Sequence, residues 1–203
     1  MPTIVLASRN RKKAGEFAEL LRPHTIELRI AADFPAAPVV EETGATFAEN
    51  AALKAGKTAR ALGRWCLADD SGLMVDALDG APGVHSARYA GPQASDAENN
   101  EKLLGALAGV PADQRGARFV CHLAVADPVG VICLRVAGYC RGLIVDAQRG
   151  SAGFGYDPYF LVPEHGLTFG ELPLEIKSRL SHRAEAFRAL MPQLVVLLQA
   201  VPP

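Results

Sequence analysis

Hydrophobic residues follow two spacings along the chain, one typical of strands and the other typical of helices. Apolar residues at 3–7 and alternating ones at 26–30 predict strands, and apolar positions three or four residues apart predict a helix over 10–21. Alternation from 119 to 136, interrupted by turn residues at 127–130, predicts an antiparallel hairpin. Helices that alternate with strands, together with a hairpin, predict an α/β fold with a mixed sheet.

Two capping boxes mark the starts of further helices. Thr46 is followed three residues later by Glu49, and Ser95 is followed in the same way by Glu98. Apolar residues at helical spacing follow both boxes and also fill the C-terminal segment. The sequence therefore predicts helices over 46–62, from 95 to about 109, and from 182 to about 198.

A polar run, Asp69-Asp70-Ser71-Gly72, separates two short apolar segments. Residues 65–68 and 73–75 each predict a short strand, and the acidic pair between them is typical of an Asx turn at a strand end. A further short strand is predicted at 159–162, after a loop with two glycines.

The composition restricts the class of protein. With 203 residues, 49% of them hydrophobic, and no internal repeat or linker, the chain predicts a single domain over 1–203. A net charge of −1 argues against a surface for nucleic acid, which needs excess Lys and Arg. The start of the chain lacks the segments typical of a signal peptide or a membrane span, so we expect a cytoplasmic protein with no membrane partner.

The four cysteines indicate neither a metal site nor a disulfide scaffold. They form no CxxC pair and stand in apolar runs, so we expect reduced cysteines in the core: Cys66, Cys121, Cys133 and Cys140.

A basic segment stands where the first strand passes into the first helix. A helix N-terminus offers backbone N–H groups and positive potential, which suit a phosphate, and Lys13 adds a charge one turn into the helix. An N-cap beside a solvated basic face is the alternative, and a P-loop is excluded because its glycine pattern is absent. The candidate phosphate contacts are Ser8, Arg9, Asn10, Arg11, Lys12 and Lys13.

Two adjacent pairs of carboxylates, Glu41-Glu42 and Asp69-Asp70, could bind a cation. Mg²⁺ takes one or two protein carboxylates together with phosphate oxygens, so one carboxylate from each pair would be enough. A solvated turn is the alternative for the first pair, as the Asx turn is for the second. The sequence leaves open which of Glu41 and Glu42 would bind the metal.

Two further groups of residues could recognise a base. The loop Gly153-Phe154-Gly155-Tyr156-Asp157-Pro158 has glycines that permit unusual backbone angles and rings that could stack on a base. Hydrogen-bond donors are concentrated just before the last helix, at Lys177, His182 and Arg183. Lys54 shares a helix face with Asn50, and could be a site residue or a solvated lysine.

Six motifs then occur in order along the chain: Ser8-Arg9-Asn10-x-x-Lys13, Glu41-Glu42-Thr43-Gly44-x-Thr46-Phe47-x-Glu49-Asn50-Ala51, Ala68-Asp69-Asp70-Ser71-Gly72-Leu73, Gly80-Ala81-Pro82-Gly83-x-x-Ser86-Ala87-Arg88-Tyr89, Gly153-Phe154-Gly155-Tyr156-Asp157-Pro158 and Ser181-His182-Arg183. Together they closely resemble the family of inosine/xanthosine triphosphate pyrophosphatases. The resemblance extends from Ile4 to the last helix.

This resemblance implies a fold and an activity. The fold would be an elongated mixed β-sheet flanked by helices, in two lobes with a central active-site cleft, of the Maf/Ham1 type and usually a homodimer. The activity would be Mg²⁺-dependent hydrolysis of free ITP, dITP and XTP to the monophosphate and pyrophosphate, which removes deaminated purines from the nucleotide pool.

The resemblance also implies roles for the motif residues. The segment from Ser8 to Lys13 would bind the triphosphate, Glu42 and Asp70 the metal, and Asp70 would be the general base. Whether Asp70 acts as base, metal ligand or both is left open. Arg9 stands where many members have glycine, which puts the backbone path of that loop in question. The remaining implied contacts are Ser71 to the substrate and Phe154, Gly155, Tyr156, Asp157, Lys177, His182 and Arg183 to base and sugar.

Three other functions can be weighed on the same residues. A Maf-like pyrophosphatase for pyrimidine or modified nucleotides would use a similar fold, but the loop at 153–158 and the Ser181-His182-Arg183 motif favour the purine enzyme. A non-catalytic nucleotide sensor would need no carboxylates aimed at a metal. A simple cation-binding protein leaves the loop at 153–158 unexplained.

Overall fold

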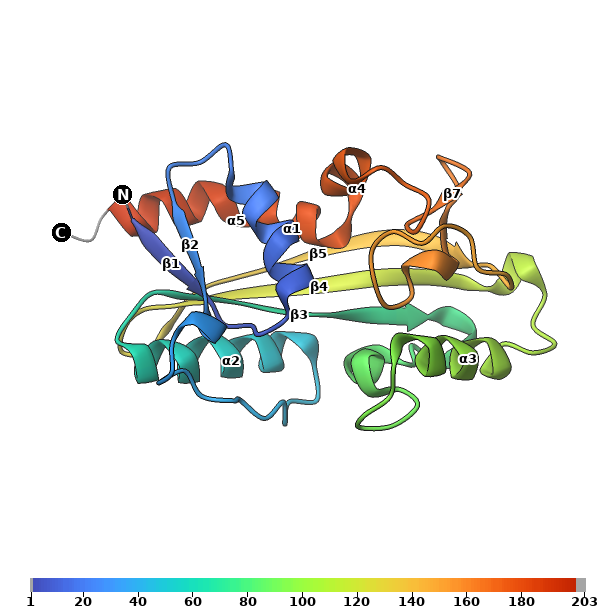
Figure 1. The fold of residues 1–203 in the computed structure, drawn as a ribbon, viewed down its shortest axis with the longest axis horizontal. Coiled ribbons are helices and arrows are strands. Elements are labelled where there is room, and N and C mark those ends of the chain that lie inside the picture. Colours follow the sequence, from blue (N-terminus) through green and yellow to red (C-terminus); the bar gives the residue numbers. More distant parts are fainter. Residues whose placement is uncertain (1, 200–203) are drawn as a thin grey trace. The chain divides into compact units, whose positions relative to one another are not determined.

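The computed structural model describes residues 2–199, so Met1 and residues 200–203 of the predicted 1–203 domain lie outside the described part. The helices are α1 (Arg11–Leu21), α2 (Phe47–Leu62), α3 (Asp96–Ala106), α4 (Leu174–Leu180) and α5 (His182–Gln199) (Figure 1). The strands are β1 (Thr3–Leu6), β2 (Glu27–Ile30), β3 (Cys66–Val75), β4 (Gly116–Ala126), β5 (Ile132–Ile144), β6 (Phe160–Val162) and β7 (Leu167–Thr168). Short 3₁₀ turns are η1 (Ala31–Asp33), η2 (Asp76–Leu78), η3 (Gly83–Arg88), η4 (Ala112–Gln114) and η5 (Asp157–Tyr159).

The strands form a mixed sheet, as the sequence predicts. Their order is β2-β1-β3-β4-β5-β6-β7 in a 7-stranded sheet. β1 pairs in parallel with β2 and β3, whereas β6 pairs in the antiparallel sense with β5 and β7. The described residues divide into two compact units, unit 1 (2–70, 121–138 and 183–199) and unit 2 (71–120 and 139–182).

Helices cover both faces of the strands in unit 1. Figure 1 shows α1 and α5 on one side of β1 and α2 on the other. Because side chains alternate along a strand, Ile4 and Leu6 pack with the α1 and α5 side chains, whereas Val5 packs with α2. The α2 face is made of small residues spaced four apart, which lets this helix lie close to the sheet: Ala51, Ala55 and Ala59.

Aromatic rings dominate the core of unit 2. Phe119 of β4 lies 4.6 Å from Phe160 and 5.6 Å from Phe169, measured between ring centroids. Leu103 and Leu107, from α3 and its C-terminal end, belong to the same cluster. Burying each side chain of this size contributes about 1.5–3 kcal/mol.

The two short strands predicted around Asp69-Asp70-Ser71-Gly72 are wrong, because β3 runs without interruption from Cys66 to Val75. An acidic pair is expected to end a buried strand because isolated buried charges are costly. Here Asp69 pairs with Lys13, and Asp70 pairs with Lys54, both across part-buried contacts. The charges are compensated, so the strand continues through them.

The helix starts are predicted correctly, whereas one strand is longer than predicted and one helix is not predicted. Both capping boxes are confirmed, at the start of α2 and at the start of α3. β5 extends to Ile144, beyond the predicted end at 136. The hydrophobic pattern does not predict α4, because a helix of 7 residues contains too few apolar repeats to reveal its period.

The cysteine prediction is confirmed in part. Cys66 and Cys121 are buried and free, and burial raises the pKa of Cys66 to about 12. The core position predicted for Cys133 is wrong, since it is exposed on β5, and Cys140 is half-buried.

None of the helices within residues 2–199 combines the length and the apolarity that crossing a membrane requires.

Candidate functional site

The alternation of side chains along β3 directs its two aspartates to opposite faces of the strand. Leu67 belongs to the core cluster of α1 and α5, whereas Cys66 and Ala68 belong to the cluster of α2. Asp69 therefore lies on the face of α1 and α5, and Asp70 on the face of α2. Two adjacent carboxylates thus enter two different environments in unit 1.

Asp70 and Glu42 share one lysine. Lys54 Nζ donates to Asp70 Oδ1 and to Glu42 Oε1, each at 2.7 Å. The Lys54 side chain is 12% exposed and that of Asp70 8%, so solvent screens this pair of contacts weakly. Lys54 therefore belongs to the candidate site, and the alternative of a solvated lysine is wrong.

The start of α2 fixes the loop that carries Glu42. Asn50 is fully buried, and its Oδ1 accepts a hydrogen bond from Gly44 N at 2.8 Å. A Cβ on Gly44 would lie 2.7 Å from that oxygen, so the loop needs glycine for this close approach. Glu41 is exposed, whereas Glu42 faces Lys54, and this difference favours Glu42 as the ligand.

The donor set around Lys54 fits a hard cation such as Mg²⁺. Glu42 and Asp70 offer carboxylate oxygens, and Asp70 Oδ2 is buried with no hydrogen-bond partner among the described residues. Within that same part of the chain, no group of three or more His, Cys, Asp and Glu side chains could hold a metal ion. Any metal here would therefore rely on two carboxylates and on oxygens supplied by a ligand.

Burial and charge shift the ionisation of this cluster in both directions. Burial raises the pKa of Asp70 above its ordinary value, although Lys54 partly opposes this shift. Burial lowers the pKa of Lys54, but the attraction of Asp70 and Glu42 is stronger, so that this pKa is raised overall. Lys54 therefore stays charged between the two carboxylates.

Asp69 lies in a separate cluster of charges in unit 1. Lys13 Nζ donates to Asp69 Oδ1, and Arg183 Nε lies 3.3 Å from Asp69 Oδ2. Cys121 Sγ donates to the same Oδ2 at 3.1 Å, and Arg183 Nη1 donates to Glu16 Oε2 at 2.6 Å. These contacts join α1, β3, β4 and α5.

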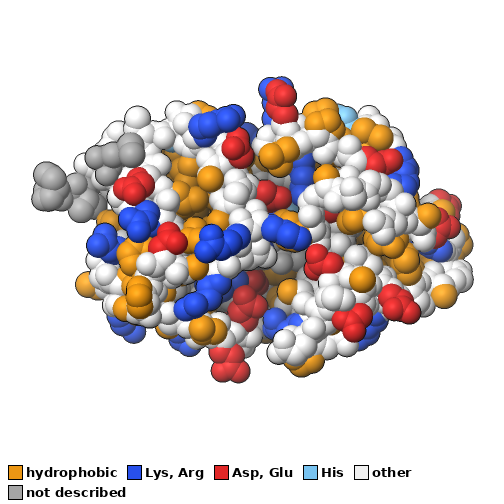
Figure 2. All heavy atoms as spheres, in the orientation of Figure 1, with side chains coloured by type: hydrophobic (Ala, Val, Ile, Leu, Met, Phe, Trp, Pro, Cys, Tyr) orange, Lys and Arg blue, Asp and Glu red, His pale blue; other side chains and the backbone are white. Residues whose placement is uncertain are grey.

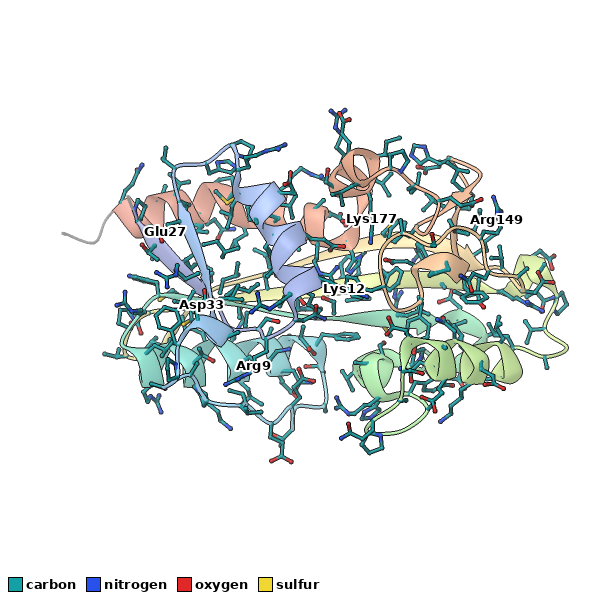
Figure 3. All side chains as sticks on the ribbon, in the orientation of Figure 1. Arg9, Lys12, Glu27, Asp33, Arg149 and Lys177 are labelled. Atoms are coloured by element: carbon teal, nitrogen blue, oxygen red, sulfur yellow. The ribbon has the colours of Figure 1, made fainter. Side chains whose placement is uncertain are left out.

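The segment before α1 is an N-cap as well as a basic patch. Asn10 is the N-cap, and its Oδ1 accepts from the backbone N–H groups of Lys12 and Lys13. Ser8 Oγ accepts from Asn10 N at 3.1 Å, and Arg9 Nη2 donates to Ala37 O at 3.0 Å. Lys and Arg side chains gather around the start of α1 in Figure 2, and Figure 3 labels Arg9 and Lys12 there. Arg11 is exposed on the same turn.

The loop after β5 in unit 2 is organised by Asp157. Its Oδ2 accepts from Phe154 N at 2.9 Å and from Lys177 Nζ at 2.7 Å. Lys177, labelled on α4 in Figure 3, also lies 5.6 Å from the centre of the Phe154 ring. Gly153 has a positive φ of 80°, and a Cβ there would meet Asp157 Oδ2 at 2.0 Å, so only glycine fits.

Asp96 and Asn100 of α3, which no sequence motif indicates as site residues, bind the same loop. Asp96 Oδ2 accepts from Gly155 N at 2.8 Å, and Asn100 Nδ2 donates to Gly155 O at 2.9 Å. They stand four residues apart and so lie on one face of α3. That spacing, next to a capping box, was the only sequence signal that could have indicated them.

The structure corrects the expectation for Tyr156. Its ring was expected to be able to stack on a base, but it is 4% exposed in the core of unit 2. Its hydroxyl donates to Ser86 O at 2.8 Å, and burial raises its pKa. These contacts favour Tyr156 as an anchor of the loop. Phe154 is the other aromatic residue of this loop, and it is half-buried.

The hydrogen-bond donors expected near the last helix are buried and do not form a solvated basic face. Lys177, His182 and Arg183 are each at most 5% exposed. His182 stacks on Phe119 in unit 2, with ring centroids 4.8 Å apart, while Arg183 pairs with Glu16 in unit 1. Ser71, the residue after Asp70, is half-buried on β3.

Asp70→Asn should stabilise the protein at neutral pH. Burial holds the folded-state pKa of Asp70 above 3.8, so its ionised form costs folding free energy. This cost is absent below the unfolded-state pKa, and appears as the pH rises through the folded-state pKa. Without divalent metal, the variant should have a higher Tm than wild type at about pH 8, and the difference should shrink at about pH 4. A lower Tm for the variant at the higher pH would contradict this explanation.

The chain matches the Ham1 family over residues 4–193. It is 52% identical over 197 residues to the dITP/XTP pyrophosphatase of Rhodopirellula baltica, covering 97% of this chain and 95% of the relative. The enzyme of the same name from Geobacillus kaustophilus is 54% identical over 190 residues, with 94% and 93% covered.

Two solved structures have the same fold. A HAM1 protein from Coxiella burnetii superposes with a TM-score of 0.87 at 44% identity, covering 97% of this chain and all of the other, 100%. The Ham1 protein of Staphylococcus aureus gives a TM-score of 0.84 at 40% identity, with 96% and 99% covered. Since both the family pattern and these relatives extend over almost the whole chain, this protein belongs to the Ham1 family.

Proposed function

We propose that this protein hydrolyses the triphosphates of deaminated purines, dITP, ITP and XTP, to the nucleoside monophosphate and pyrophosphate. Relatives named dITP/XTP pyrophosphatases match almost the full chain at 52% and 54% identity. The observation that carries the proposal is the cluster of Glu42, Lys54 and Asp70, which combines two carboxylates and a cation as phosphoryl chemistry requires.

Unit 1 would bind the triphosphate. The start of α1 supplies positive potential and the basic residues from Arg9 to Lys13, and Ser8 adds a hydroxyl. The Lys54 ammonium would leave the carboxylates and bind a phosphate oxygen. Binding that spreads the negative charge of pyrophosphate over several cations makes it a better leaving group.

Mg²⁺ is the cofactor that the carboxylates fit. Glu42 and Asp70 would hold it, and Glu41 is the weaker candidate because it is exposed. When bound, the ion would supply a positive charge that offsets the charge of the phosphates.

Asp70 would act on the attacking water. The water oxygen bonds to the α-phosphorus as the bond from that phosphorus to the bridging oxygen breaks, and the water proton passes to the Asp70 carboxylate. Asp70 Oδ2 is the oxygen that would accept this proton, because it is buried with no hydrogen-bond partner among the described residues. Ser71 would contribute a further substrate contact.

The loop at 153–158 and the donors near the last helix would recognise the base. Hypoxanthine and xanthine carry an acceptor at O6, where adenine carries an amino donor, so a site built from donors leaves groups unpaired against adenine. Such sites discriminate by roughly 10⁴ or more. Lys177, His182 and Arg183 are the candidate donors, and Phe154, Gly155 and Asp157 the candidate loop contacts, with Tyr156 as the anchor described above.

Pyrophosphate release from ITP, dITP, XTP, dTTP and ATP, with and without Mg²⁺, tests the function. We expect rapid release from the first three substrates only, dependent on Mg²⁺ and lost in Asp70→Asn. The matched control is Asp33→Asn, which removes an exposed carboxylate that lies 3.8 Å from Arg29 Nε. Release of orthophosphate, or equal turnover of ATP and ITP, would contradict the proposal.

We also propose that the chain acts on free nucleotides in the cytoplasm as a homodimer. Within unit 1, α2 and the turn between β4 and β5 line a groove of about 620 Å³ that includes Leu53 and Ile132. Among the lining residues, Glu49 lies near the start of α2, Arg60 near its end and Leu53 between them. A copy related by a two-fold axis near Leu53 would set each Glu49 opposite an Arg60.

Light scattering after gel filtration tests the dimer. Leu53→Asp should convert the dimer to a monomer, because it buries an unpaired charge in the interface. Val196→Asp, at a residue that is 67% exposed on α5, should leave the dimer intact. A monomeric wild type at micromolar concentration, or a dimeric Leu53→Asp variant, would argue against this surface.

A further inference from the structure

Asp69 is a fully buried carboxylate for which the proposed reaction has no use. Its side chain is 0% exposed, and it stands beside Asp70 in the sequence but on the opposite face of β3. Burying an ionised carboxylate is costly unless cations and hydrogen-bond donors surround it. The residues that surround Asp69 therefore indicate what it does.

Two cations and a thiol contact the two carboxylate oxygens of Asp69. Lys13 Nζ donates to Oδ1, whereas Arg183 Nε and Cys121 Sγ contact Oδ2 at 3.3 and 3.1 Å. Asp70 differs, because its Oδ2 has no hydrogen-bond partner among the described residues. Of the two aspartates, Asp70 is thus the one with an oxygen available to a metal or a water.

Lys13 is the partner through which Asp69 could affect the reaction. A lysine side chain has a long flexible stem, and ordering it costs conformational entropy at the moment that a ligand binds. In this protein the ammonium is already in place, one turn into α1 and 16% exposed. A cation that is ordered before binding stabilises phosphate charge at a lower cost.

Arg183 gives the same carboxylate a second connection. Its guanidinium contacts Asp69 and also donates to Glu16 of α1 at 2.6 Å. Because Glu16 and Lys13 are three residues apart on α1, they lie on one face of that helix. Arg183 therefore bridges Asp69 of β3 and Glu16 of α1, and Asp69 also contacts Lys13.

From these contacts we propose that Asp69 is a positioning residue, which holds the Lys13 ammonium in place for the triphosphate of the substrate. It is not a metal ligand and takes no part in proton transfer. The inference rests on the proposed function, because it needs a triphosphate substrate for Lys13 to bind.

A double-mutant cycle between Asp69 and Lys13 tests the inference. Asp69→Asn should raise the KM for ITP about tenfold or more with a smaller change in kcat, since it loosens a binding group. In a Lys13→Met background, the same substitution should change kcat/KM by about twofold or less, because the lysine that it positions is gone. If the loss of kcat/KM in the double variant equals the product of the losses in the two single variants, the proposal is overturned.

A control separates positioning from general destabilisation. Leu194→Ala removes a fully buried core side chain of α5 in unit 1 and should lower Tm, while the KM for ITP stays within about twofold of wild type. A KM for Leu194→Ala that rises as far as that of Asp69→Asn would assign the effect to lost stability and overturn the proposal.

Asp69→Glu provides the variant that retains the charge. It keeps a carboxylate but moves it by one methylene, so its KM should lie between wild type and Asp69→Asn. If Asp69→Asn does not fold, the same cycle is run with Asp69→Glu. If the wild type releases pyrophosphate from ITP but the cycle shows no coupling between Asp69 and Lys13, this inference alone is refuted. If the wild type does not hydrolyse ITP, the proposed function is refuted.

Discussion

The structure depends on neutralising the charges of two buried carboxylates, which belong to adjacent residues of one strand. Asp69 and Asp70 stand next to each other on β3, and a strand must send them to opposite faces. Each therefore needs its own cation from a different helix, Lys13 of α1 for one and Lys54 of α2 for the other. Without both cations a continuous buried strand through this sequence would be strongly unfavourable.

This compensation divides the work between two clusters in unit 1. On the α2 face, Asp70 keeps an oxygen without a partner among the described residues and has a raised pKa, which suits a group that binds a metal or accepts a proton. On the α1 and α5 face, Asp69 contacts Lys13, Arg183 and Cys121, which suits a group that fixes others. We expect the ionised form of Asp70 to lower the stability of the fold, as is common for residues that bind a ligand.

Much of this arrangement could be predicted from the sequence. Capping boxes located α2 and α3 because cap chemistry is local, and alternation located the strands for the same reason. The continuity of β3 could not be predicted, since it depends on Lys13 and Lys54, which are distant in the sequence. The burial of Tyr156 was missed because its partner, Ser86 O, is equally remote. The motifs indicated the residues of the candidate site. Only the fold shows which side chains are available to a ligand and which ones position other side chains.

The division between Asp69 and Asp70 is tested most directly by the binding of Mn²⁺, which prefers oxygen ligands as Mg²⁺ does and can be followed by electron paramagnetic resonance. The measurement compares the dissociation constant of Mn²⁺ for wild type, Asp70→Asn and Asp69→Asn without nucleotide. Asp70→Asn should weaken binding about tenfold or more, and Asp69→Asn should change it by about twofold or less. Equal loss in both variants, or loss in Asp69→Asn alone, would contradict the account.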